Sequence, residues 1–343
     1  MVMLSGMSAR GLRGFGLHRL VVMFTLVFTA FALVLIVRLR PDYIHPTELG
    51  TDVATYFAAG QRLVTGHEIY ALSPGDRPVP IWPPFWTVPL VGPPTIAVIW
   101  APLAALLPPI LSIYGWWLAA FLVTAAIFVW TVLRGTVLTA VAAAILSFST
   151  IITGLTGNMN GLLIGALAAM WFVSQRPQTT RRDVAIGVVV ALATALKFGP
   201  SIFGLWLLAM GRWRAAAAAI AAGLAIALVT LIVAGPDIVP TYLRLAADTA
   251  AGGVTPYSAG GILQGMGLPH AVVVAAPALV AVICGALAYV LRRHPAAAFS
   301  IVAVGVTFAL PVVRFESLSF LLVALVPWTR SMHEGPSPTA TVE

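Results

Sequence analysis

Long apolar runs separated by very few charges constrain this chain more than any other feature. Its 343 residues include 19 Lys or Arg and 11 Asp or Glu, so about 9% are charged, whereas a soluble domain carries roughly 25%. So few charges cannot cover a water-soluble surface, and 60% hydrophobic residues exclude a disordered chain. At roughly 20 residues per membrane helix, the apolar content predicts a single all-α polytopic membrane domain over 1–343, with about 9–11 transmembrane helices.

The basic character of the chain does not indicate nucleic-acid binding. The pI is about 10.4, but the arginines are scattered in twos and threes between apolar runs, as in cytoplasmic loops. Cys284 is the only cysteine, which excludes an internal disulfide and a thiolate metal site. We expect this thiol to be buried among apolar side chains.

The basic residues also orient the chain in the membrane. Arg10, Arg13 and Arg19 precede the first apolar run, so 1–37 is expected to be a cytoplasmic stretch followed by an uncleaved first span. Residues 38–109 are expected to form a long outer loop. Six prolines in 85–109 favour a re-entrant or surface element there, because proline breaks helices. The alternative, two full spans within 85–133, would place Arg134 outside.

The rest of the chain divides into hairpins and one further loop. Core hairpins are expected over 110–234, a second outer loop over 235–270, spans over 271–330, and a cytoplasmic tail over 331–343. The arms 184–197 and 198–211 hold only about 14 residues each, or about 21 Å, against a hydrocarbon core of roughly 30 Å. The tip that begins at Lys197 is therefore expected to lie below the outer surface, inside the protein.

Sorting the charges by side indicates a site on the outer face. Eight of the eleven acids fall outside, whereas twelve of the nineteen basic residues fall inside. Lys197 interrupts an apolar run at membrane depth, where a cation is costly and faces a cavity or a partner. It is expected either to bind a lipid phosphate or to extend to the interface.

Asp52 opens a segment that suits a short amphipathic helix on the outer leaflet. In one interpretation Asp52 or Thr51 caps this helix. In the other, a carboxylate near apolar elements has a raised pKa and serves as a general base.

A series of short segments then points to a known family. Asp52-Val-Ala-Thr-Tyr56 begins the series, and Gly157-Asn-Met-Asn-Gly-Leu-Leu163 is similar to a Gly-Gln-x-Asn-x-Leu pattern. In this order, the chain resembles glycosyltransferase family 87 at 52–56, 59–66, 69–70, 81–84, 102–108, 157–163, 195–200, 211–215 and 257–263. Two departures are that Asn158 stands in place of Gln, and that the late outer turn at 311–317 lacks the family's His.

The resemblance implies a GT-C membrane glycosyltransferase whose long first outer loop carries the catalytic Asp, which corresponds to Asp52. It also implies a lipid-phosphate sugar donor and chemistry outside the cytoplasm. The expected reaction is an inverting transfer of a hexose, most often mannose, from a polyprenyl-phosphate-linked donor to an envelope glycolipid or glycan at the plasma membrane. Membrane lipids are the remaining expected partners.

Each candidate site residue has an expected role in that reaction. Asp52 is the general base, and Lys197 stabilises the departing phosphate with help from Arg314 or Arg62. The other candidates are Asn158, Asn160 and Tyr56 for sugar hydroxyls, Tyr70 and Trp82 for stacking or plain packing, and Glu316 as a second carboxylate or a salt-bridge partner of Arg314. Because protein cations can neutralise a monophosphate leaving group, we expect no metal and no other cofactor.

Two rival functions share the same span pattern. A transporter or lipid flippase would also carry a buried cation, but its usual inverted repeats have no matching halves in this sequence. A scaffold subunit of an envelope-synthesis complex would leave Asp52 and Lys197 without a role.

Overall fold

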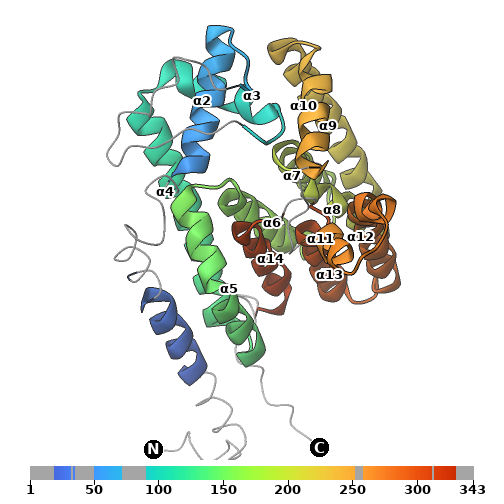
Figure 1. Cartoon of the computed structure of the whole chain (residues 1–343). Coiled ribbons are helices and arrows are strands. Elements are labelled where there is room, and N and C mark those ends of the chain that lie inside the picture. The colour runs from blue at the N-terminus through green and yellow to red at the C-terminus, as the bar shows by residue number, and fades with distance from the viewer. Residues whose placement is uncertain are drawn as a thin grey trace, which may run out of the picture.

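The protein is helical throughout the part that the structure describes. The computed structural model describes residues 19–31, 34, 50–71, 90–251, 258–310 and 313–329, and no strand occurs among them. Figure 1 shows helices only, with the first apolar helix, Arg19–Phe31, standing beside α5. The predicted all-α membrane class is confirmed. Trp82 and the whole segment 72–89 lie outside the described residues.

The helix boundaries follow the apolar runs. Up to the turn at 157–159, the helices are α2 (Thr51–Thr65), α3 (Thr95–Leu106), α4 (Pro109–Arg134) and α5 (Val137–Thr156). In the middle of the chain they are α6 (Asn160–Ser174), α7 (Thr180–Leu196), η1 (Gly199–Ser201), α8 (Ile202–Ala209), α9 (Trp213–Ala234) and α10 (Ile238–Ala251). The last helices are α11 (Ala259–Gly265), α12 (His270–Val290), α13 (Pro295–Phe308), η2 (Phe315–Phe320), α14 (Leu321–Leu325) and η3 (Val326–Trp328).

Several helices are suited to a lipid environment. Among the described residues, α4, α5, α9 and α12 are long and apolar enough to cross a membrane. On α9, Ile220, Leu224, Leu228 and Ile232 follow one another at intervals of four residues, and each side chain is more than half exposed. Such a stripe on one face of a helix faces lipid in a membrane protein. The chain is a helical membrane protein.

The turn between α5 and α6 is pressed against the start of α2. Gly157 ends α5 with a φ of 67°, a left-handed conformation that favours glycine. A Cβ at this position would lie 3.0 Å from Cγ1 of Val53, so the absence of a side chain also permits the close approach. This contact places the first turn of α2 beside the polar residues that follow Gly157.

The start of α2 differs from the sequence prediction. Its N-cap is Gly50, with a φ of 64° and no side-chain cap, so the prediction that Thr51 or Asp52 caps the helix is wrong. The amide of Gly50 instead donates to the carbonyl of Leu155 at 3.0 Å, which fixes α2 to the end of α5. Because the backbone ties this end down, the Asp52 side chain is available for a tertiary contact.

Close packing against α3 holds α2 in place. A Cβ on Gly60 would lie 2.6 Å from the carbonyl carbon of Trp100, so the two backbones meet at this glycine. Trp100 is 1% exposed, and its ring contacts those of Phe57 and Trp116, with centroids 6.5 and 5.0 Å away. At 12 residues, or about 18 Å, α3 is shorter than a bilayer core of roughly 30 Å.

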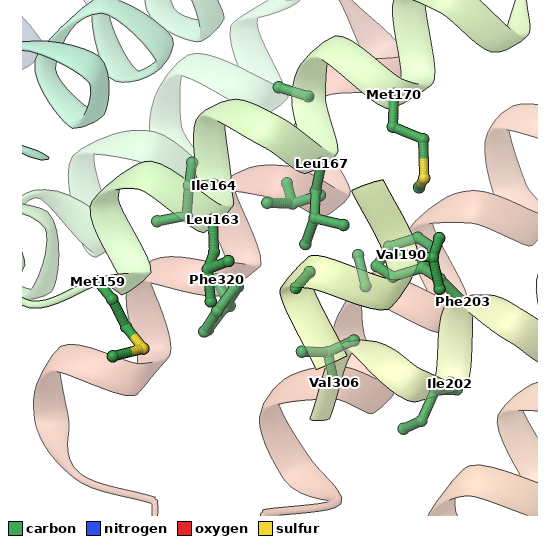
Figure 2. Close-up of a cluster of buried hydrophobic side chains, with 14 of the residues drawn as sticks. Met159, Leu163, Ile164, Leu167, Met170, Val190, Ile202, Phe203, Val306 and Phe320 are labelled. Atoms are coloured by element: carbon green, nitrogen blue, oxygen red, sulfur yellow. The ribbon is translucent and has the colours of Figure 1, made fainter. Parts of the chain in front are cut away.

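A buried apolar core lies beneath the α5–α6 turn. Figure 2 shows side chains from α6, α7, α8, α13 and η2 directed toward one another. The labelled residues are Met159, Leu163, Ile164, Leu167, Met170, Val190, Ile202, Phe203, Val306 and Phe320. This core sets the positions of the ends of α6, α7 and η2, where the polar side chains gather.

A buried ion pair joins the other ends of these helices. Arg212, before α9, donates from one nitrogen to Asp183 in the first turn of α7 at 2.8 Å and from another to the carbonyl of Ser174 at 2.5 Å. Both charged side chains are almost fully buried. This end carries the arginines that are expected, from the sequence, to lie in the cytoplasm.

Removing one partner of this pair is expected to destabilise the protein, because it leaves the other charge buried and uncompensated. The Asp183→Leu variant should lose about 3 kcal/mol of unfolding free energy, measured by denaturant unfolding in detergent. The double variant Asp183→Leu, Arg212→Met should lose less, since no isolated charge remains. The exposed Asp237 provides the control, Asp237→Leu. Equal losses in the single and double variants would contradict the interpretation.

Candidate active site

Asp52 meets the α5–α6 turn through its side chain. The Nδ2 atom of Asn158 donates to Oδ2 of Asp52 at 2.8 Å, although 106 residues separate them in the chain. The hydroxyl of Thr156, at the end of α5, also donates to this carboxylate. Asp52 is half-buried, so part of the carboxylate is accessible while the rest is held by the protein.

The same turn extends the network to Lys197. Oδ1 of Asn158 accepts from the backbone amide of Asn160 at 2.9 Å, and Oδ1 of Asn160 accepts from Nζ of Lys197 at 2.9 Å. Nδ2 of Asn160 faces the carbonyl of Glu316 at 3.5 Å. A continuous path of hydrogen bonds therefore links the acidic group at the start of α2 to the cation at the end of α7.

Lys197 lies where the chain changes direction. It follows α7 in an extended conformation, and Gly199 and Pro200 begin η1 directly afterwards. Its Nζ atom is 5.4 Å from the centre of the Phe320 ring, and the side chain is half-buried. The ammonium group is thus held between an amide oxygen and an aromatic face, with part of its surface accessible.

Residues before and within η2 close the cluster. Arg314 is exposed and precedes η2, and Glu316 is half-buried in its first turn. Both side chains interact electrostatically with Asp52. Two carboxylates and two cations therefore occupy one end of the helix bundle.

The residues that fix η2 to α5 are not among those expected from the sequence. The Ser149 hydroxyl donates to the Phe315 carbonyl at 2.7 Å, and the Thr153 hydroxyl donates to the Glu316 carbonyl at 2.9 Å. Along α5, Thr153 follows Ser149 by four residues and Thr156 follows Thr153 by three. This spacing places the three hydroxyls on one face of the helix. That spacing of small hydroxyl residues in an apolar helix was the available signal.

Burial dominates the electrostatics of the two carboxyl groups. It raises the pKa of Asp52 above the ordinary value of 3.8, against the opposing effects of the Asn158 and Thr156 hydrogen bonds and of the positive charges of Lys197 and Arg314. Burial likewise raises the pKa of Glu316, in the predicted outer turn, and the negative charge of Asp52 adds to this. A carboxylate that is costly to keep charged is a stronger base.

Tyr56 lies on the same face of α2 as Asp52, one turn further on. Its side chain is 7% exposed, and its hydroxyl oxygen contacts the backbone amide of Met159. Burial raises the pKa of this phenol well above 10, so the hydroxyl stays protonated. Tyr56 thus borders the cluster.

Two candidates lie elsewhere. Arg62 is 2% exposed near the end of α2, where it donates to the carbonyl of Ile69 at 3.2 Å. The Tyr70 hydroxyl donates to the carbonyl of Gly92 at 3.3 Å, and its ring stacks on Tyr242 with centroids 6.1 Å apart. The structure does not bring either of them to the Asp52 cluster.

In the described part of the chain, no group of three or more His, Cys, Asp or Glu side chains could hold a metal ion. Asp52 and Glu316 are near one another, but the other side chains that interact with them are amides, hydroxyls and cations.

The geometry defines the class of protein. It is a helical membrane protein with an acid, a cation and bridging amides at one end of its bundle. The sequence model of glycosyltransferase family 87 matches residues 91–314, and the chain belongs to this family. It is therefore a membrane glycosyltransferase. The matched stretch contains Asn158, Asn160 and Lys197 and ends at Arg314, whereas Asp52 precedes it. No curated protein and no solved structure matches the chain.

Proposed function

We propose that the protein transfers a hexose, mannose in the first instance, from a polyprenyl-phosphate-linked donor to an envelope glycolipid or glycan on the extracytoplasmic face of the plasma membrane. The observation that carries this proposal is the hydrogen-bonded path from the Asp52 carboxylate to the Lys197 ammonium. The path holds a base and a cation in one accessible cluster.

Asp52 acts as the general base in this proposal. It takes the proton of the acceptor hydroxyl as that oxygen attacks the anomeric carbon of the donor sugar. The bond from the anomeric carbon to the phosphate oxygen breaks in the same step, so the configuration inverts. Half-burial leaves the carboxylate accessible, and its raised pKa strengthens it as a base.

Lys197 and Arg314 stabilise the departing polyprenyl phosphate. As the bond to the sugar breaks, negative charge grows on the phosphate oxygens, and fixed cations favour that change. Lys197 is anchored by Asn160, whereas Arg314 is exposed and free to follow the substrate. Because two protein cations neutralise a monophosphate, we propose that no metal is required.

The membrane placement also belongs to the proposal. The helix ends away from the cluster carry Arg134, Arg176, Arg181 and Arg292. Positive charge favours the cytoplasmic side of a membrane. The cluster then faces the extracytoplasmic side, with both termini inside.

The test uses the full chain reconstituted in vesicles with a radiolabelled polyprenyl-phosphate hexose. Label appearing in an acceptor glycolipid, dependent on the protein, supports the proposal. Movement of labelled lipid between leaflets without transfer would instead identify a flippase. Comparing mannose with glucose, galactose and arabinose donors identifies the sugar.

The pH dependence of transfer follows from the raised pKa of Asp52. The base works only when deprotonated, so activity is present above that pKa and is lost as the pH falls through it. The acid limb of kcat/KM is therefore expected above pH 3.8, the ordinary value for Asp. A pH–rate profile checks this, and full activity at pH 3.8 would contradict it.

A further inference from the structure

The rarest polar residues of this chain meet in the candidate site. The sequence contains a single lysine, Lys197, and only two asparagines, Asn158 and Asn160. All three belong to the path that begins at Asp52. The proposed function assigns tasks to the base and the cation, and it leaves the two amides without one.

The orientation of the Asn158 amide is set by its neighbours. The backbone amide of Asn160 can only donate, so the atom that it meets is the oxygen Oδ1 of Asn158. This turns the Nδ2 group of Asn158 toward Oδ2 of Asp52, where it donates at 2.8 Å. The bond favours the charged form of the carboxylate and restricts its rotation.

Asn160 is oriented in the same way on its other side. The ammonium of Lys197 can only donate, so it meets Oδ1 of Asn160 at 2.9 Å. Nδ2 of Asn160 then faces the Glu316 carbonyl, an acceptor, at 3.5 Å. The side chain of Asn160 therefore joins the cation to η2.

Exposure separates the two amides from the charged groups that they hold. Asn160 is 0% exposed and Asn158 is 8% exposed, whereas Asp52, Lys197 and Glu316 are half-buried. A side chain without exposed surface has no room for a sugar hydroxyl. The expectation that both asparagines bind sugar therefore fits their surroundings less well than a supporting role.

We propose that Asn158 and Asn160 are positioning residues, in which Asn158 holds the Asp52 carboxylate and Asn160 holds the Lys197 ammonium. Because the backbone amide of Asn160 fixes Asn158, the two supports form one unit that sets the base and the phosphate-binding cation relative to each other. This inference rests on the proposed function of Asp52 and Lys197.

The Asn158→Ala variant tests the first support. Without the hydrogen bond to the charged carboxylate, the acid limb of kcat/KM should move to higher pH by about one unit. The KM for the donor should stay within about threefold, since the cation is untouched. The isosteric Asn158→Asp variant should move the limb in the same direction, because it removes the donor and adds a like charge.

The Asn160→Ala variant tests the second support. Its KM for the donor should rise about tenfold, because a displaced ammonium binds phosphate less well, and its acid limb should not move. Asn160→Asp keeps an oxygen for Lys197 and should restore most of the donor affinity. Thr150→Ala is the matched control. The Thr150 hydroxyl is buried on α5 and donates within its own helix to Leu146, so both readouts should stay unchanged.

Asp52→Asn, measured in parallel, separates the two proposals. If it is inactive while both Asn158 variants leave the acid limb in place, the positioning role is overturned and the proposed function stands. An Asn158 variant that raises a substrate KM without moving the limb would identify a direct sugar contact. Folded protein is quantified by size exclusion in detergent, and lost folding with an unchanged limb would show a structural role only.

Discussion

Replacing Asp52 with asparagine is expected to lower glycosyl transfer by at least about 100-fold, the usual contribution of a general base. The amide is nearly the same size and can still hydrogen-bond Asn158, but it cannot accept the proton of the acceptor hydroxyl. Because the carboxyl is half-buried and its pKa is raised, the change also removes a charge that is costly to bury. The folded protein should therefore be at least as stable as the parent.

Initial rates in vesicles, normalised to folded protein, measure this effect. Asp237→Asn is the matched control, since it makes the same chemical change at an exposed position in the predicted second outer loop. Its activity should equal that of the parent. An Asp52→Asn variant with full activity would end the assignment of Asp52 as the base, whatever the fate of the other residues.

Replacing Lys197 with methionine is expected to lower kcat/KM for the lipid donor by about 100-fold, the scale seen when one charge-stabilising donor is removed from a transition state. Methionine keeps an apolar stem against the Phe320 ring and removes only the ammonium. The KM for the acceptor should change far less, because the acceptor carries no departing phosphate.

Rates measured across donor and acceptor concentrations separate the two effects. Arg244→Met is the matched control, since it removes an exposed cation from α10, in the predicted second outer loop. It should leave both kinetic constants unchanged. Equal losses toward donor and acceptor in Lys197→Met would argue against a phosphate contact.

The polar residues of the site could be named from the sequence, but their meeting could not be derived from it. The scarcity of polar groups and the family-like segments point to Asp52, Asn158, Asn160 and Lys197. The same pattern points to Arg62, which binds a loop carbonyl instead. Nothing in that pattern indicates Thr153, whose hydroxyl binds η2 across the bundle.

The sequence by itself determined the class of protein, a helical membrane protein, and the position of its longest apolar helices. Hydropathy adds up residue by residue along an apolar run, and glycine and proline mark where a helix ends. The apolar runs and their breaks are therefore local properties of the sequence. What only the tertiary structure decided is which breaks come together. Val53 contacts Gly157 across more than a hundred residues of chain, and Trp100 contacts Gly60 across some forty. Both contacts depend on the shape of the folded protein. Those contacts bring the start of α2 to the α5–α6 turn, where hydrogen bonds link the Asp52 carboxylate to the Lys197 ammonium.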